Sequence, residues 1–281
     1  MKSLLWEPFR LGKMELRNRI VMPPMVTRYA DEQGYITERM KNYYEARAKG
    51  GAGLIIVEAH FVHQLGRVYP NQANISDDRC IPGLSALVQL IHKHGAKAAI
   101  QLHHCGRMTK LDLNGMQPVA PSALATPEGR VPKELTVEGI AEIVAHFAAA
   151  ALRAKKAGFD SVELHGAHGY IIDQFLSRST NRRKDEYGGN LEKRARFLVE
   201  IIKAIKEAAG KSYPVWPRIN GKEYGVEQGT TLEEAQQIAR MAEEAGADAI
   251  HVSAGGPTAP THLTSATFVP AVIADLAEGI K

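Results

Sequence analysis

The sequence SVELHGAHGY, residues 161–170, joins a short apolar run to a loop rich in glycine and histidine. Residues 161–164 predict a buried strand, and Gly166 and Gly169 allow the chain to turn tightly at its carboxyl end. A helical pattern over residues 137–157 precedes the strand and is followed by Gly158, the residue type that commonly ends a helix. Helix, strand and loop together predict one repeat of an α/β fold.

The same alternation of apolar runs and amphipathic helical patterns extends along the chain. The predicted strands occupy residues 19–22, 54–58, 98–102, 161–164, 215–219 and 249–252. Helical patterns occupy residues 83–94, 137–157, 191–209 and 232–245, and residues 272–281 predict a last helix. Most strands are continuous apolar runs, as in parallel sheets buried on both faces. These features predict a single α/β domain over residues 1–281, a (β/α)8 TIM barrel with about six of its eight units present.

The composition indicates a globular protein and argues against several classes of binding partner. Of the 281 residues, 44% are hydrophobic, which suffices for a large core. Lys and Arg total 35 and Asp and Glu 31, a net charge of +4, and no basic and aromatic cluster marks a nucleic-acid surface. Cys80 and Cys105 lack metal-binding spacing, and the sequence shows neither a signal peptide nor a membrane-spanning run. We therefore expect a cytoplasmic protein with reduced thiols that binds neither nucleic acid nor a membrane.

A long irregular segment follows the third predicted strand. Residues 105–133 are rich in glycine, proline and polar side chains. In a barrel this segment would leave the carboxyl end of a strand, the side on which loops carry function. We expect a lid or a substrate-binding excursion here.

The loop after the fourth predicted strand holds the candidate catalytic residues. His165, His168 and Tyr170 can converge, so that two imidazoles donate hydrogen bonds to a developing oxyanion and a phenol delivers a proton. Spacing alone equally allows two structural loop histidines or a His-x-x-His metal pair. A metal site would need a further ligand such as Glu163 or His103, and no established zinc spacing links these residues.

Further motifs surround this loop: NRIVMPPM at 18–25, Gln101 with Gly106-Arg107, DQFLS at 173–177, NRRKDEYGG at 181–189 and Pro217-Arg218. Together they resemble the old yellow enzyme, or NADH:flavin oxidoreductase, family. The resemblance runs from about residue 5 to residue 281 and includes the barrel types of 2,4-dienoyl-CoA reductase and 2-enoate reductase.

The resemblance implies a barrel that binds flavin mononucleotide (FMN) and accepts hydride from NADH or NADPH. It implies that Pro23, Pro24, Met25 and Val26 lie against the flavin and that Ala59 approaches the same ring. Gln101 would bond the pyrimidine edge of the isoalloxazine. Arg218 would lie near N1 and O2, where a fixed guanidinium favours the reduced anion.

The substrate implied by the resemblance is a small α,β-unsaturated carbonyl or enoyl-type compound. His165 and His168 would hold its carbonyl oxygen, and Tyr170 would protonate its α carbon. Many family members have Asn at the position of His168, and either side chain can donate a hydrogen bond.

Two features depart from the family pattern. Val26 stands where relatives often have a Thr or Cys that contacts the flavin. In addition, the loops after strands seven and eight, which usually hold the cofactor phosphate, are expected to lie beyond Lys281. Some long relatives append a 4Fe-4S cluster and a flavin adenine dinucleotide (FAD) region after the barrel, and these would also lie beyond Lys281.

The incomplete barrel leaves alternatives to an ene-reductase. One is a non-catalytic or split barrel fragment that associates as a homo-oligomer or with a complementing C-terminal polypeptide. A weaker one is a metal-dependent barrel hydrolase that uses His103, His165 and His168.

Overall fold

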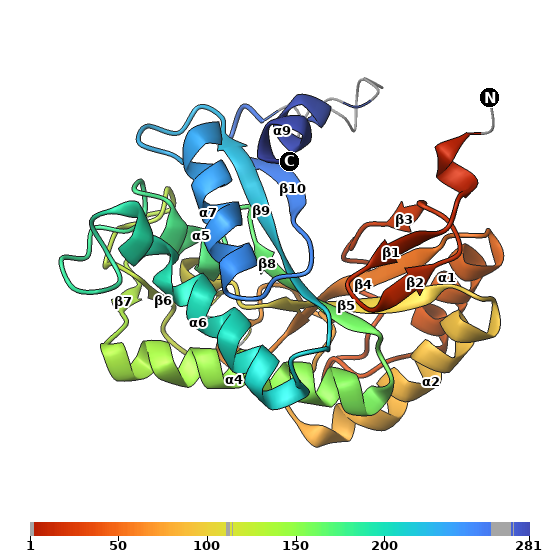
Figure 1. The fold of residues 1–281 in the computed structure, drawn as a ribbon. Coiled ribbons are helices and arrows are strands. Elements are labelled where there is room, and N and C mark those ends of the chain that lie inside the picture. Colours follow the sequence, from red (N-terminus) through yellow and green to blue (C-terminus); the bar gives the residue numbers. More distant parts are fainter. Residues whose placement is uncertain (1–2, 111–112, 114, 260–270, 272) are drawn as a thin grey trace.

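The computed structural model describes residues 3–110, 113, 115–259, 271 and 273–281 (Figure 1). Its centre is a six-stranded parallel sheet in the order β10-β9-β8-β5-β4-β3. These strands are β3 (Val21–Met22), β4 (Leu54–Phe61), β5 (Lys97–His103), β8 (Ser161–Gly166), β9 (Val215–Glu223) and β10 (His251–Gly255). The order is that of six consecutive units of a (β/α)8 barrel, with edges at β3 and β10.

The helices cover the outer face of the sheet, where α2, α4 and α6 lie side by side (Figure 1). The helices are α1 (Glu38–Lys49), α2 (Ile81–Lys93), α4 (Val137–Ala157), α5 (Ile171–Leu176), α6 (Leu191–Ala209), α7 (Leu232–Glu244) and α9 (Ala274–Ile280). Thr136 and Thr231 cap α4 and α7 as N-cap residues. Gly158 ends α4 with a φ of 97°, the left-handed conformation expected there. Among the described residues, no helix combines the length and apolarity needed to span a bilayer.

Each predicted strand is present within three residues of its expected ends, apart from the carboxyl end of β9, which extends four residues further. The sequence did not predict α1, α5 or two small sheets outside the barrel. These sheets are an antiparallel hairpin of β1 (Phe9–Leu11) and β2 (Met14–Leu16), and a parallel pair of β6 (Val119–Ala120) and β7 (Lys133–Glu134). Short 3-10 turns lie at Leu4–Trp6, Gln64–Gly66, Asp78–Cys80 and Gly106–Met108.

Alternation along the strands separates the two faces of the sheet. Outward residues such as Ile100 and Leu164 pack under the helices in the main core. On the inner face, Met14 and Leu16 of the hairpin pack with residues of β4, β5 and β9, including Trp216. The hairpin therefore fills the amino-terminal end of the barrel interior, and the space at the carboxyl end remains for a site.

The segment 105–133 leaves β5 and returns through β6 and β7, although residues 111, 112 and 114 lie outside the described part of the chain. Gln174 of α5 ties its beginning to the barrel, because its Nε2 donates to the carbonyl of Cys105 at 3.1 Å and its Oε1 accepts from the backbone N–H of Arg107 at 3.2 Å. The described residues of this segment do not line the cavity discussed below.

Candidate active site

A cavity of about 510 Å³ lies toward the carboxyl ends of the parallel strands. Five strands of the sheet and the loops after β3, β4 and β8 contribute to its wall. The residues that line it are Pro24, Met25, Val26, Arg28, Ala59, Tyr69, Gln72, Gln101, His103, His165, His168, Tyr170, Arg218 and Ser253. Every site residue expected from the sequence lies in this wall except Pro23.

The loop after β8 is fixed by its backbone conformation and by a buried carboxyl group. His165 lies within β8, one residue before the strand ends, and not at the strand end expected from the sequence. His168 and Gly169 both have positive φ angles, of 62° and 75°. The backbone N–H of Gly169 donates to Asp173 Oδ2 at 2.7 Å, which ties the turn to α5. Tyr170 occupies the N-cap position of that helix.

Four rings meet in edge-to-face contacts at this end of the cavity. The centroid of His165 lies 5.0 Å from that of His168 and 4.7 Å from that of Tyr170. The centroid of His103, on the neighbouring strand, lies 4.3 Å from that of Tyr170. His168 Nε2 lies 2.7 Å from Ser253 Oγ. The structure thus brings His165, His168 and Tyr170 together.

Burial determines the protonation of these groups. It lowers the pKa of His103 to about 3, and it holds the pKa of His165 well below its ordinary value, with the neighbouring histidines acting in the same direction. Burial, followed by the proximity of Tyr69, raises the pKa of Tyr170. At neutral pH, His165 and His103 are therefore neutral imidazoles with one N–H each, and Tyr170 keeps its proton.

The part of the cavity wall that follows β3 is apolar from Pro24 to Val26. Strand β3 ends at Met22, and the chain then passes along the cavity through Pro24, Met25 and Val26. The side chains of Met25 and Val26 are 58% and 38% exposed, although both are hydrophobic. Ala59 of β4 adds a small buried surface beside them. A flat aromatic ligand would cover this exposed apolar surface.

Two residues that point into the barrel, Gln101 of β5 and Arg218 of β9, supply polar groups to the cavity. Gln101 is 2% exposed, and its Nε2 donates to Glu163 Oε1 at 2.7 Å. Arg218 forms no salt bridge within the described residues, and its Nε is buried without a hydrogen-bond partner there, as is Nδ1 of His165. Buried donors are normally satisfied, so these atoms fit a ligand with several acceptors, as the isoalloxazine of FMN has. The donor set and the apolar wall therefore fit this cofactor.

Sequence reasoning missed several wall residues. Arg28, Tyr69 and Gln72 come from irregular loops, and Ser253 lies on β10. The guanidinium of Arg28 lies 4.5 Å from the ring centroid of Tyr69, and Arg28 has a positive φ of 58°. The position of Ser253 near the carboxyl end of a predicted strand was the available signal, whereas the loop residues gave none.

The metal-site alternative is not supported. Among the residues that the structure describes, no group of three or more His, Cys, Asp or Glu side chains could hold a metal ion. His103 and His165 contact each other through ring edges, with centroids 5.5 Å apart. Cys80 and Cys105, the two cysteines of the chain, are free and buried and lie in different parts of the fold.

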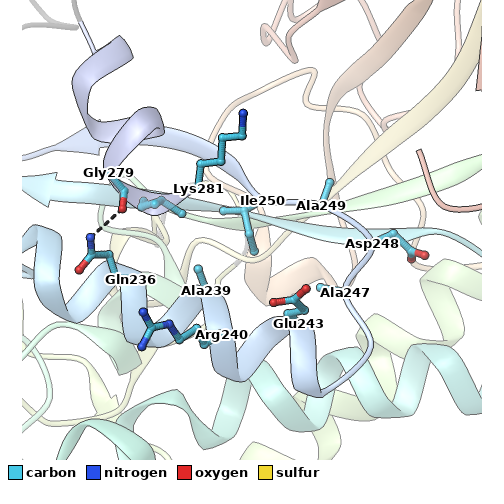
Figure 2. Close-up of a pocket in the computed structure, with 11 residues that line it drawn as sticks. Gln236, Ala239, Arg240, Glu243, Ala247, Asp248, Ala249, Ile250, Gly279 and Lys281 are labelled. Atoms are coloured by element: carbon cyan, nitrogen blue, oxygen red, sulfur yellow. Dashed lines mark hydrogen bonds between the residues drawn. The ribbon is translucent and has the colours of Figure 1, made fainter. Parts of the chain in front are cut away.

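A second cavity of about 300 Å³ lies between α7 and the last residues of the chain (Figure 2). Gln236 Nε2 donates to the carbonyl of Gly279 at 2.6 Å across it. Asp248, at one end, already accepts from Lys206 Nζ at 2.7 Å and from the backbone N–H of Val215 at 2.9 Å. Asp248 is therefore engaged in bonds that hold the fold together and is not available as a catalytic carboxylate in this cavity.

Comparison with known proteins identifies the family. The model of the NADH:flavin oxidoreductase / NADH oxidase family matches residues 4–258. An NADH oxidase from Thermoanaerobacter brockii is 48% identical over 281 residues, which are 99% of this chain and 43% of that protein. The chain therefore spans less than half the length of this relative.

Solved structures agree with the fold. A 2-naphthoyl-CoA reductase in complex with 2-naphthoyl-CoA is 34% identical with a TM-score of 0.87, over 92% of this chain and 42% of that one. An old yellow enzyme homologue from Zymomonas mobilis is 30% identical with a TM-score of 0.83, over 99% of this chain and 80% of that one. This chain belongs to the NADH:flavin oxidoreductase / NADH oxidase family, and its sheet and helices form the greater part of an old yellow enzyme-type barrel.

Proposed function

We propose that this chain carries the active site of an FMN-dependent oxidoreductase that uses NADH or NADPH to reduce the activated C=C bond of an α,β-unsaturated carbonyl or enoyl-type compound. The observation that carries the proposal is one cavity with two kinds of wall. One wall is apolar and exposed, at Met25 and Val26, and the other holds His165, His168 and Tyr170 in mutual contact.

The cofactor half of the proposal assigns the binding of FMN to residues of the first, second, third and fifth parallel strands. Pro23, Pro24, Met25, Val26 and Ala59 would contact the ring, and Gln101 and Arg218 would bind its polar edge. When bound, FMN supplies the transfer of hydride from the reduced nicotinamide to the substrate. Arg218 would stabilise negative charge at the pyrimidine edge, because its guanidinium is fixed in a buried wall.

The substrate half of the proposal rests on hydrogen-bond donors. His165 and His168 would donate to the carbonyl oxygen of the substrate and so polarise its conjugated double bond. Tyr170 would give its proton to the α carbon, and burial keeps that proton in place until it is needed. The segment 105–133 would act as a lid or substrate-binding excursion, a role supported by its exit from the carboxyl end of β5.

A visible spectrum tests the proposal. The purified chain is mixed with FMN, separated from free flavin, and treated anaerobically with NADH or NADPH. We expect retained flavin absorbance that bleaches with the nicotinamide and recovers when 2-cyclohexenone is added. A chain that retains no flavin, even with a polypeptide carrying the following barrel strands, would support the non-catalytic alternative, and metal analysis of the same sample tests the hydrolase alternative.

A further inference from the structure

Inside the barrel, a row of side chains with Glu163 at its centre lies between the cavity and the hydrophobic cluster around Met14 and Leu16. Glu163 is completely buried on β8. Strand register places it opposite Gln101 of β5 on one side and opposite Trp216 of β9 on the other. Two residues further along these strands, His165 and Arg218 are paired in the same way and line the cavity. Glu163 therefore lies in the row of side chains next to the one that holds His165 and Arg218, and it does not itself line the cavity.

Three N–H groups from three different strands converge on the carboxylate of Glu163. Its Oε1 accepts from Gln101 Nε2 at 2.7 Å, and its Oε2 accepts from Trp216 Nε1 at 2.8 Å. His251 Nδ1 lies 2.7 Å from the same Oε2. The indole nitrogen can only donate and an ionised carboxylate can only accept, so the direction of these bonds is fixed by chemistry.

The bond to Glu163 fixes the orientation of the Gln101 amide. Because the carboxylate needs a donor, the NH2 end of Gln101 must face Glu163, and the carbonyl Oε1 faces away from it. Gln101 lines the cavity, and its carbonyl Oε1, which is not used by Glu163, is available to a ligand there as an acceptor. The pyrimidine edge of a flavin carries an N–H at N3, which such an acceptor matches.

Glu163 also places a negative charge beside Arg218. Burial lowers the pKa of Arg218, and the charge of Glu163 acts against that shift, so the two groups interact. The residues that line the cavity include Arg28 and Arg218 but no Asp or Glu. The carboxylate of Glu163, in the row below, is thus a buried negative charge that partly offsets Arg218 at the floor of the site.

We propose that Glu163 is a positioning residue for the cofactor: it orients the Gln101 amide as an acceptor for the flavin, and its charge opposes negative charge on the reduced ring. This inference rests on the proposed function, since it concerns the binding of FMN. It adds a residue outside the cavity wall that acts on the ring through Gln101 and Arg218.

The variant Glu163→Gln tests both parts. Its carbonyl can still accept from Trp216, which turns its NH2 group toward Gln101 and forces the Gln101 amide to reverse. We expect the Kd of oxidised FMN to rise about tenfold, the effect of replacing one acceptor by a donor. We also expect the ratio of the Kd of oxidised FMN to that of reduced FMN to rise about tenfold, which raises the two-electron midpoint potential by about 30 mV.

A double-mutant cycle separates positioning from general loss of structure. In a Gln101→Met background, Glu163→Gln should no longer weaken the binding of oxidised FMN, because the amide through which it acts is gone. The rise in potential should remain, because it depends on charge. Asp160→Asn is the matched control, since this carboxylate precedes the same strand at the other end of the barrel and binds Lys97 at 2.9 Å. Asp160→Asn should leave the Kd of oxidised FMN and the midpoint potential unchanged.

A measurement on the unliganded wild-type chain covers the case in which Glu163→Gln does not fold. The side-chain NH2 of Gln101, assigned by its loss in Gln101→Met, should exchange slowly with solvent in NMR spectra. Fast exchange would overturn the inference, as would a folded Glu163→Gln protein with unchanged Kd and potential. If the wild-type chain binds no FMN at all, the proposed function fails first and this inference fails with it; FMN binding that Glu163→Gln does not alter refutes this inference alone.

Discussion

The turn before α5 positions Tyr170 at the cavity, and burial keeps its hydroxyl protonated, as a proton donor requires. Tyr170→Phe keeps the ring that contacts His103 and His165 but removes the hydroxyl. We expect reduction of 2-cyclohexenone by the reduced flavoprotein to slow by about 100-fold, and reduction of the flavin by NADPH to change less than about twofold. Stopped-flow measurement of the two half-reactions checks this.

Tyr213→Phe is the control for that experiment, because Tyr213 is a buried tyrosine whose hydroxyl donates to the carbonyl of Phe159 outside the cavity. Equal losses in the two half-reactions of Tyr170→Phe would refute its role as proton donor. Since burial raises the pKa of Tyr170, the alkene half-reaction of the wild type should also not lose rate between pH 6 and pH 9.

Val26 offers only methyl groups to the wall where a hydroxyl could bond the flavin. Val26→Thr keeps the shape of the side chain and adds a donor at the cavity. We expect the midpoint potential of bound FMN to rise, because a hydrogen bond near O4 stabilises the reduced ring more than the oxidised one. Equilibration with a reference dye measures the midpoint potential of FMN bound to each protein. Equal potentials in Val26→Thr and the wild type would contradict the prediction.

The residues that sequence predicted and those that it missed differ in how they are positioned. Gln101, His165 and Arg218 lie on strands, so their alternation and register bring them to one face. Arg28 and Tyr69 reach the cavity from loops whose course depends on tertiary packing, and no local pattern encodes it. From the sequence, Glu163 was only a candidate metal ligand, because the three hydrogen bonds that define its role join four strands.

At the scale of elements, the strands and their helices followed from hydrophobic periodicity and caps. The β1–β2 hairpin did not, since strands of three residues carry too little alternation to stand out. Helix α5 has only six residues, all buried, and therefore lacks an amphipathic pattern. In both cases the element is held by contacts with distant parts of the chain, which local sequence does not report.

Buried histidines on neighbouring strands make the stability of the sheet depend on pH. Burial lowers the pKa of His60, on β4, to about 4. Between pH 6.5 and pH 4 the unfolded chain binds a proton at this residue that the folded chain does not, so stability falls as the pH falls. From pH 7 to pH 5 this single group should cost about 2 kcal/mol of the free energy of unfolding.

His60→Met removes that proton-binding group from the same buried position. Urea unfolding at pH 7 and pH 5 should show a loss of stability on acidification that is smaller by about 2 kcal/mol than in the wild type. Phe61→Leu, a change at the adjacent buried residue, is the control and should keep the wild-type loss. A His60→Met protein with the same loss as the wild type would show that His60 does not contribute to this pH dependence.

At the scale of the whole molecule, the interior of the barrel is arranged in layers. Met14 and Leu16 close the amino-terminal end, the row around Glu163 follows, and the cavity lies above it. The sheet has six strands in the described chain, with β3 and β10 at its edges. The apolar wall, Gln101 and Arg218 thus lie together in one cavity, where under the proposed function they would contact the ring of the flavin.

This arrangement predicts which part of the cofactor the chain recognises. In (β/α)8 barrels the phosphate is usually bound by the loops after strands seven and eight, whereas the ring contacts proposed above would lie on the six strands described here. We therefore expect the 281-residue chain to bind riboflavin and FMN with Kd values within about threefold of each other. Quenching of flavin fluorescence measures both constants. If FMN binds more than about tenfold more tightly, the phosphate has a site within these residues. Arg28, an exposed residue that lines the cavity, would then be the candidate phosphate ligand, and Arg28→Met should remove the preference for FMN over riboflavin.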